Sequence, residues 1–347
     1  MSILNSIKII KPNDWHVHLR EGNMMEAVIK CSSRVNYHCI VMPNLKSPIT
    51  LSQQAIDYKR KINSLSLDDD FNPLIPCYLT EKMDLKDFKF AIENKIFVGA
   101  KLYPSNATTN SKSGISNIDK IFPSLEILTD LKRPLLIHGE KIGEDIDIFD
   151  REKYFVDDEL DTIRRKFPEL KIVLEHVSSK YGADYVNSNN NIAGTITLQH
   201  MMLTKEDVFF DDSINPHLFC MPVVKTDQDR LALREYACSG NNKFFLGTDS
   251  APHHIIDKIP NKFSKPGIFS SPCSIEVYTS IFDEENSLHN LEKFSSINGA
   301  LFYDLPISSK FINLEKESWK LPEFTLFKDI SVKNFMGGEE IKWKVLR

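Results

Sequence analysis

Two histidines near the start of the chain, His16 and His18, alternate with other residues in the segment DWHVHLR. On a β-strand, residues i and i+2 point to the same side, so both imidazoles and Arg20 would line one face, with Asp14 behind them. Neighbouring imidazoles are suitable ligands for a borderline metal such as zinc. The pair alone is weak evidence, because two histidines after an edge strand are more often surface residues.

Three further metal-capable residues follow apolar runs elsewhere in the chain. His138 follows LLI, His176 follows IVLE, and Asp249 follows FFLGT. A single histidine at a strand end is usually a hydrogen-bonded structural residue, but four that are placed alike favour one shared site. Four histidines and one aspartate exceed the needs of one tetrahedral zinc, so the set predicts two metal ions.

Lys101, in the segment GAKLYP, ends another apolar run. An ammonium group beside two metal ions would be repelled, so this lysine either points away or loses its charge. A neutral lysine amine can react with CO2 to give a carbamate, an anionic group whose two oxygens can bridge two metals. The spacing leaves a phosphate-binding or solvent-reaching lysine open as the alternative.

Eight short apolar, β-branched runs recur along the chain and are separated by longer polar stretches. The runs lack clean alternation, which is typical of parallel strands buried on both faces, and the stretches are long enough for crossover helices. Eight such repeats predict a (β/α)8 TIM-type barrel; a doubly wound open sheet ranks second, because no glycine-rich phosphate loop follows the first strand. The predicted strands are residues 7–15, 37–42, 73–79, 97–102, 134–137, 171–174, 192–198 and 244–246, with helices over residues 51–63, 117–132, 157–167 and 227–239.

The barrel explains why the candidate ligands come from distant segments. In such a barrel the carboxyl ends of all strands share one face, so the six residues would meet there. We expect the barrel over residues 1–301 and a C-terminal extension packed on it over residues 302–347. Within the extension, residues 331–345 are predicted to form a hairpin around Gly337 and Gly338.

The composition excludes several classes of protein. With 41% hydrophobic and 26% charged residues in 347, the chain is typical of a soluble globular protein with a sizeable core. The net charge of −5, without a basic stripe, argues against a nucleic-acid partner. Because no run reaches the roughly 18 apolar residues of a membrane span and the first ten residues lack signal-peptide features, we expect no membrane partner and a cytoplasmic location. The 6 cysteines show no C-x-x-C spacing and are expected to be reduced.

Together, these segments are similar to a known group of enzymes. DWHVHLR, VMPN, GAKLYPSNATTNS, IHGE, LEHVSS and GTDSAPH resemble the amidohydrolase superfamily, and within it the dihydroorotase family in its short, single-barrel bacterial form. The similarity runs from about Pro12 to Leu301. It implies a homodimer that interconverts N-carbamoyl-L-aspartate and dihydroorotate, the ring-closing step of pyrimidine synthesis, through a hydroxide that bridges two zinc ions.

The resemblance also implies how the metals are held. One zinc would be bound by His16, His18, Asp249 and carboxylated Lys101, and the other by Lys101, His138 and His176. Asp249 would in addition take a proton from the hydroxide and give it to the leaving ring nitrogen, so it would be both a metal ligand and a general acid/base.

Substrate contacts follow from the same resemblance. Arg20 offers a planar fork for a carboxylate, and Asn44 offers an amide donor and acceptor. Met221 matches a position that the family uses through backbone groups. Pro266 departs from the pattern, because proline has no N–H to donate, so its carbonyl or the neighbouring Gly267 would have to supply the contact. The implied substrate contacts are His18, Arg20, Asn44, His138, Met221, His253 and Pro266.

The polar stretch over residues 105–116 follows the fourth predicted strand. In the family the matching loop closes over bound substrate, so Thr108 and Thr109 would donate hydrogen bonds to it while excluding water. Without the resemblance, a loop of this composition would be interpreted as an ordinary solvated connection.

Two other functions stay open at this point. The first is a different cyclic-amide hydrolase, such as a hydantoinase or allantoinase, which would differ in whether its substrate must carry a carboxylate. The second is a catalytically silent barrel that serves as an assembly partner. Silent chains of this kind usually lose metal ligands, whereas this sequence retains all six candidates.

Overall fold

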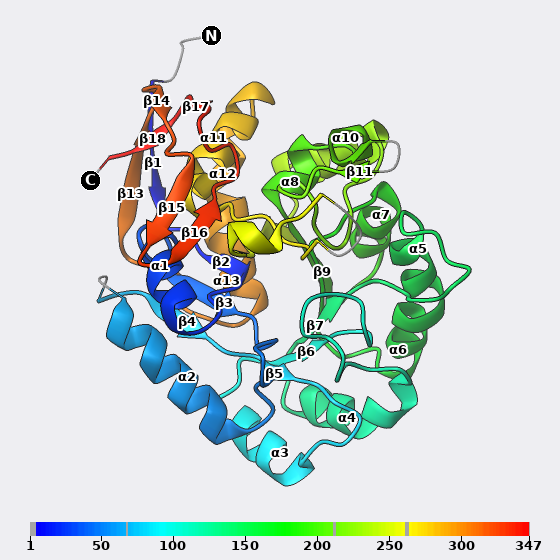
Figure 1. Ribbon diagram of the computed structural model, residues 1–347. Coiled ribbons are helices and arrows are strands. Elements are labelled where there is room, and N and C mark those ends of the chain that lie inside the picture. The colour runs from blue at the N-terminus through cyan, green and yellow to red at the C-terminus, as the bar shows by residue number, and fades with distance from the viewer. Residues whose placement is uncertain (1–4, 67–68, 211–212, 261–263, 347) are drawn as a thin grey trace.

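The computed structural model describes residues 5–66, 69–210, 213–260 and 264–346. At its centre parallel strands form a barrel, and helices surround it (Figure 1). The predicted (β/α)8 architecture is confirmed. The barrel strands are β2 (Asp14–Val17), β3 (His38–Val41), β4 (Asn72–Leu74) with β5 (Cys77–Tyr78), β6 (Ala100–Leu102), β7 (Leu135–His138), β8 (Ile172–Glu175), β9 (Ile192–Ile196) and β12 (Phe244–Leu246).

Parallel pairing runs through two adjoining sheets, β2-β3-β4 and β5-β6-β7-β8-β9-β12. The predicted strand over residues 73–79 is divided between β4 and β5, where Pro76 cannot donate to the ladder. Backbone bonds close the barrel between its first and last strands: the N–H of Asp249 donates to the carbonyl of His16 (2.9 Å), and the N–H of His18 donates to that of Ser250 (3.0 Å). The closure therefore places residues from the two ends of the barrel side by side.

An irregularity in β2 directs two consecutive side chains into the barrel. The pairing of β2 with β3 shifts register between Asp14 and Val17. Trp15 packs into an inner apolar cluster with Phe245 and stacks on Tyr303, with ring centroids 4.7 Å apart. His16 also faces the interior, which strict alternation would forbid and a bulge permits.

Helices connect successive strands and cover the outside of the barrel (Figure 1). The four segments predicted as crossover helices are helical, with two of them divided by 3-10 or π turns. The helices are α1 (Gly22–Ser33), α2 (Ser52–Leu65), α3 (Leu85–Glu93), η1 (Ile118–Ile121), α4 (Phe122–Asp130), α5 (Arg151–Phe155), η2 (Val156–Leu160), α6 (Asp161–Lys166), α7 (Lys180–Ser188), α8 (Leu198–Met202), α9 (Lys205–Val208), α10 (Asp227–Cys238), η3 (Ile255–Asp257), η4 (Ser271–Cys273), α11 (Ser274–Glu284), α12 (Leu288–Glu292), η5 (Lys293–Ile297) and α13 (Asn298–Phe302).

The first predicted strand was wrong in one respect. Its N-terminal half is β1 (Ser6–Ile10), which leaves the barrel and pairs antiparallel with β13 (Phe311–Glu315) of the C-terminal segment. Figure 1 shows this blue strand among the orange and red strands of the extension. The domain boundary at residue 301 stays a prediction, but the extension's sheet includes a strand from the N-terminal side.

The predicted hairpin around Gly337 and Gly338 was also wrong. β16 (Ile330–Lys333) pairs with β15 (Phe324–Phe327), across a turn in which Lys328 has a φ of 51°. A local turn forms at Gly337, because its N–H donates to the carbonyl of Asn334 (2.9 Å), but the N–H of Gly338 donates to the carbonyl of Leu321 and the strands on the two sides of the turn pair with other strands. The remaining short strands are β10 (Phe209–Phe210), β11 (Ser213–Ile214), β14 (Trp319–Lys320), β17 (Glu340–Ile341) and β18 (Lys344–Val345).

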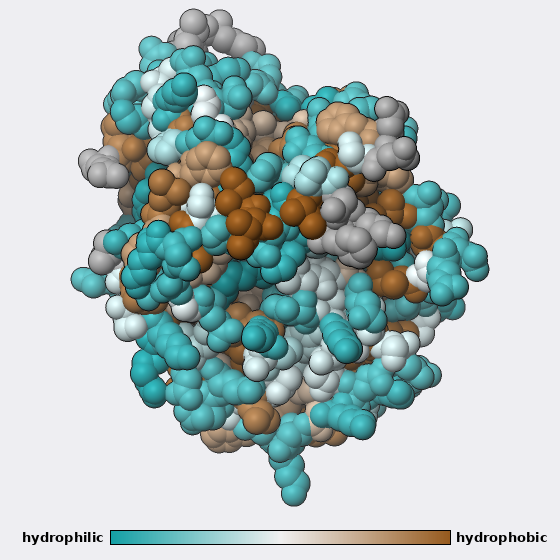
Figure 2. Space-filling view, viewed as in Figure 1, coloured by the Kyte–Doolittle hydropathy of each residue, from teal (hydrophilic) through white to brown (hydrophobic). Residues whose placement is uncertain are grey.

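The surface seen in Figure 2 is largely hydrophilic, with hydrophobic side chains gathered near its centre, over the segment that is yellow in Figure 1. Within this segment η3 carries Ile256, which is 74% exposed. No helix in the described part of the chain is long and apolar enough to span a membrane.

The packing of Trp15 generates a prediction about the fold. A Cβ added at Gly299 would overlap the indole of Trp15, whose strand carries His16. Gly299→Ala should therefore lower the free energy of unfolding by about 1–3 kcal/mol, measured by urea denaturation. Gly143→Ala is the matched control, because its Cβ would meet only the flexible side chain of Ile146, and it should change stability by less than about 0.5 kcal/mol. Equal effects of the two variants would contradict this packing argument.

Candidate active site

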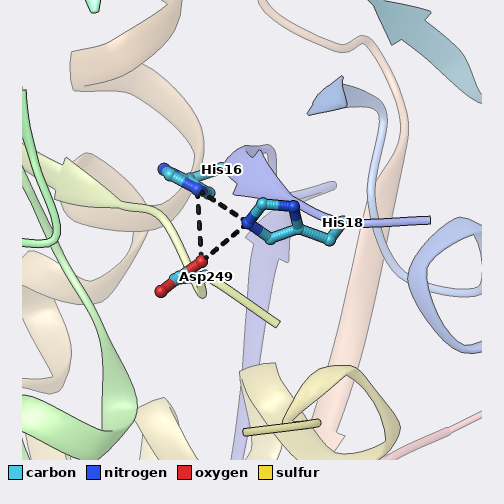
Figure 3. A group of neighbouring side chains, drawn as sticks. All are labelled: His16, His18 and Asp249. Atoms are coloured by element: carbon cyan, nitrogen blue, oxygen red, sulfur yellow. Dashed lines mark hydrogen bonds and ion pairs between the residues drawn. The ribbon is translucent and has the colours of Figure 1, made fainter. Parts of the chain in front are cut away.

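Three of the predicted metal ligands converge at the carboxyl ends of β2 and β12. Figure 3 shows His16, His18 and Asp249 pointing toward one another. Asp249 Oδ1 lies 3.2 Å from His16 Nε2 and 3.0 Å from His18 Nε2, and the two ring nitrogens are 3.3 Å apart. All three side chains are buried, and their ligand atoms lie within 4.8 Å of one another. Two imidazoles and a carboxylate so arranged could hold one divalent ion.

The remaining predicted ligands, Lys101, His138 and His176, lie next to this group. They do not form a second group whose ligand atoms are as close together as those of His16, His18 and Asp249. The ring of His176 lies 5.1 Å from that of His16 and 4.7 Å from that of His138, measured between centroids. His138 Nε2 faces Glu140 Oε2 at 2.6 Å. The Nζ of Lys101 contacts Glu175.

Glu175 and Glu140 are site residues that the sequence analysis missed. Glu175 is fully buried, and its Oε1 lies 3.1 Å from Nδ1 of His16, the ring nitrogen that faces away from Asp249. The two atoms are within ion-pair distance but do not form a hydrogen bond, so Glu175 acts on His16 through its proximity and charge. A signal was present in the sequence, because Glu175 immediately precedes His176 and Glu140 stands two residues after His138.

Sharp backbone turns aim several of these side chains. Arg20, His176 and Asp249 have φ values of 61°, 43° and 47°, in the left-handed region that non-glycine residues rarely adopt. Residues held in this region typically cluster at functional sites, where the surrounding structure compensates for the strain. His176 directly follows β8, and Asp249 is the third residue after β12, so both lie where barrel strands end.

Burial sets the protonation states in the site. It lowers the pKa of His18 to about 3 and the pKa of His16 below its ordinary value, so both rings are neutral, as metal ligation requires. Burial would raise the pKa of Asp249, but the adjacent His16 and His18 outweigh it and hold that pKa well below the usual range. Burial also lowers the pKa of Lys101 well below that of an exposed lysine, which favours the neutral amine.

A small closed pocket adjoins these groups. Its volume of about 20 Å³ is enough for roughly one water molecule. All the predicted site residues except Lys101 and His253 line it. The sequence analysis did not assign two further lining residues, Tyr103 and Ala251, to these walls, and Gly267, named there only as a replacement for Pro266, also lines the pocket.

The loop over residues 105–116 covers this pocket. Asn44 Nδ2 donates to the carbonyl of Thr109 (3.0 Å), and Asn110 Nδ2 donates to the carbonyl of Asn44 (2.9 Å). Thr108 and Thr109 both line the pocket. Their proposed role as a lid stays a prediction, but the loop is held closed through the same Asn44 that is expected to contact substrate.

One wall of the pocket brings the predicted carboxylate-binding residues together. Arg20 Nη2 lies 3.1 Å from Nε2 of His253, and that nitrogen lies 3.0 Å from the carbonyl of Pro266. Gly267 does not offer the donor that Pro266 lacks, because its N–H already donates to the carbonyl of Phe219 (2.9 Å).

Lys258, which the sequence analysis did not consider, fixes the backbone behind this wall. Its buried Nζ donates to three carbonyls: Gly267 at 2.7 Å, Lys265 at 2.9 Å and Phe219 at 3.3 Å. Burial lowers the pKa of this amine to about 7. The side chain therefore ties the segment before Met221 to the segment that contains Pro266.

A barrel with two histidines on its first strand, a buried lysine and further histidines at later strand ends, and an aspartate after the last strand defines the amidohydrolase class. No family model matches the chain. It is 44% identical over 346 residues to a dihydroorotase of Buchnera aphidicola subsp. Schizaphis graminum, covering 99% of this chain and 98% of that protein.

Solved structures agree with this relationship. A dihydroorotase of Saccharomyces cerevisiae, solved in complex with 5-fluoroorotic acid, aligns with a TM-score of 0.93 and 31% identity over 99% of both chains. The L-hydantoinase of Arthrobacter aurescens shares the fold alone, with a TM-score of 0.80 and 14% identity over 97% of this chain and 82% of that one. The chain belongs to the dihydroorotase family. It is a hydrolase of cyclic amides that acts in pyrimidine biosynthesis.

The three bonds of Lys258 lead to a second prediction. Lys258→Met should release the wall segments and lower kcat/KM by about tenfold or more, chiefly through KM, because small displacements of a binding wall weaken productive binding. Lys265→Met is the matched control, since Lys265 lies on the same loop but is exposed, and within the described residues its ammonium group pairs only with Asp257. Steady-state kinetics on both variants would decide, and an unchanged KM in Lys258→Met would contradict this role.

Proposed function

We propose that the pocket hydrolyses dihydroorotate reversibly to N-carbamoyl-L-aspartate with two zinc ions, one of them held by His16, His18 and Asp249. The observation that carries this proposal is the convergence of these three buried ligands beside a closed pocket that Arg20 and Asn44 also line. When bound, the ions would polarise the amide carbonyl and lower the pKa of a water molecule.

The residues present fit such ions. Buried imidazoles in the neutral form and one carboxylate are the ligand types that zinc prefers. Nδ1 of His176 is buried and has no hydrogen-bond partner among the described residues. When this nitrogen carries a lone pair, a metal ion would supply the partner that the lone pair lacks. His138 and His176, together with Lys101, are the residues that we propose for the second ion.

We assign Lys101 the role of carboxylated lysine. Its fully buried amine, with a strongly lowered pKa, has the free electron pair that attacks CO2; the new N–C bond forms as one C–O π bond of CO2 opens, and the proton that leaves the nitrogen passes to water. The product is an anionic carbamate, whose two oxygens could reach both ions. It would need to leave its present contact with Glu175.

Substrate would be oriented by its carboxylate. Arg20 supplies a charged planar donor, with His253 beside it and Asn44 across the pocket. The yeast relative was solved with 5-fluoroorotic acid, a pyrimidine ring with a carboxylate, which supports this assignment. Backbone groups of Met221 and Pro266 would contact the ring, and Thr108 and Thr109 would exclude water while the loop is closed.

Asp249 would carry the proton in both directions. Its carboxylate is charged, because its pKa is held low, and one oxygen lies in the group formed with His16 and His18. The carboxylate would take the proton of the attacking water and pass it to the ring nitrogen as the amide bond breaks. Ring closure is the reverse of the same steps.

A cytoplasmic homodimer is also part of this proposal and rests on the resemblance to bacterial dihydroorotases. Sedimentation of the purified chain would measure its oligomeric state, and a monomer at working concentration would overturn that part.

The carboxylate specificity gives a third prediction. Arg20→Met should lower kcat/KM for dihydroorotate by an amount that corresponds to about 2–5 kcal/mol of lost transition-state stabilisation, because the buried substrate carboxylate loses its charged partner. Metal content should stay unchanged, since Arg20 is not among the proposed ligands. Hydrolysis of dihydrouracil, which lacks the carboxylate, should be slow in both proteins and nearly unaffected by the substitution. Equal losses on both substrates, or a native preference for dihydrouracil, would favour a hydantoinase-like function instead.

The metal centre gives a fourth prediction. Native protein should contain two divalent ions per chain and added CO2 on one lysine, measured by elemental analysis and native mass spectrometry. Lys101→Ala should lose the added CO2, bind fewer ions and lack activity, with short carboxylic acids restoring part of it. Lys171→Ala is the control and should keep both ions, because Lys171 directly precedes β8, at the end of that strand away from Glu175 and His176. An unmodified Lys101 in active, fully loaded enzyme would contradict the carbamate.

A further inference from the structure

Several buried polar atoms in the pocket lack a hydrogen-bond partner within the described part of the chain. They include Oδ1 of Asn44, Oγ1 of Thr109 and the hydroxyl of Tyr103, and all three residues line the pocket. An unpaired buried polar atom costs roughly 1–3 kcal/mol, so such atoms gathered in one cavity indicate where a ligand is expected to bond. Asn44 and Thr109 already have proposed contacts with substrate, whereas Tyr103 has none.

The ring of Tyr103 is held in place on several sides. The side chain is 1% exposed and follows β6 directly, two residues after Lys101. Its ring stacks on that of Tyr78 with centroids 5.2 Å apart, and the ring of His138 lies 6.1 Å away. The Nζ of Lys101 lies 4.8 Å from its centroid. A rigid aromatic ring therefore presents an unpaired hydroxyl beside the proposed metal ligands.

Chemistry limits what this hydroxyl can do. A tyrosine hydroxyl can donate one hydrogen bond, and this one lines the pocket without an acceptor among the described residues. The negatively charged end of the substrate is expected at Arg20, which leaves the neutral carbonyl oxygens of the ring for a neutral donor. Stabilisation of a carbonyl oxygen that gains charge during attack is a common function of such donors.

We propose that the hydroxyl of Tyr103 donates a hydrogen bond to a ring carbonyl oxygen of the bound substrate on the side facing Lys101 and His138. This inference rests on the proposed function, because it requires a cyclic amide in this pocket. It adds a catalytic residue to those taken from the resemblance.

A pair of matched variants tests it. Tyr103→Phe removes only the hydroxyl. Tyr303→Phe is the control: it also removes a buried hydroxyl without a partner in the described chain, but Tyr303 belongs to the inner apolar cluster and not to the pocket wall. Both variants should keep the wild-type metal content and melt at the wild-type temperature or slightly above it. Tyr103→Phe should lower kcat/KM for dihydroorotate by about 10- to 100-fold, mainly in kcat, whereas Tyr303→Phe should match the wild type.

Two measurements separate the possible failures. Wild-type protein that neither turns over dihydroorotate nor binds 5-fluoroorotate in a calorimeter would overturn the proposed function and this inference with it. Active wild type with an equally active Tyr103→Phe would overturn only the inference about Tyr103. A loss of activity in Tyr103→Phe that is accompanied by lost metal or a lower melting temperature would also overturn it, because the role would then be structural.

Discussion

The site depends on the closure of the barrel between its first and last strands. The carboxylate of Asp14, at the start of β2, accepts hydrogen bonds from the N–H (2.9 Å) and the hydroxyl (2.6 Å) of Thr248, directly before Asp249. Burial raises the pKa of Asp14 to about 6, while these bonds oppose the shift, which shows how costly the buried charge would be without its donors. Because of this junction, His16, His18 and Asp249 meet although 231 positions separate His18 from Asp249.

Burial then converts this junction into a site with defined chemistry. In water the same imidazoles and amine would titrate near their ordinary values; inside the barrel the imidazoles are neutral and the aspartate is charged. Glu175 and Glu140 supply the negative charge that such a group needs on its outer side. The strained backbone at Arg20, His176 and Asp249 is tolerated because it aims side chains into a region that the rest of the barrel holds rigidly.

The sequence predicted those features that repeat along the chain. His138, His176 and Asp249 could be recognised because each follows a buried strand, and the strand count gave the barrel. Features that depend on contacts between distant segments could not be predicted. Nothing in the sequence distinguishes Glu175 from other acidic residues, because its role depends on its position beside His16. In the same way, the role of Lys258 depends on the three carbonyls that its Nζ contacts. The first predicted strand was extended too far because it continued through Lys11, Pro12 and Asn13 to Trp15, whereas the structure passes from the extension's sheet to the barrel at these residues. The hairpin around Gly337 failed because the strands on the two sides of this turn pair with other strands, β16 with β15 and β17 with β14.

The hydrogen bonds that join Asn44 to the loop over residues 105–116 also affect how tightly any molecule can bind. A ligand that accepts a hydrogen bond from Asn44 Nδ2 must compete with the protein's own carbonyl at Thr109, so it binds only the fraction of molecules in which this bond is broken. The apparent dissociation constant therefore exceeds the intrinsic one by the inverse of that fraction. An inhibitor that leaves the hydrogen bond between Asn44 and Thr109 intact would avoid this loss, whereas one that replaces this bond must first break it.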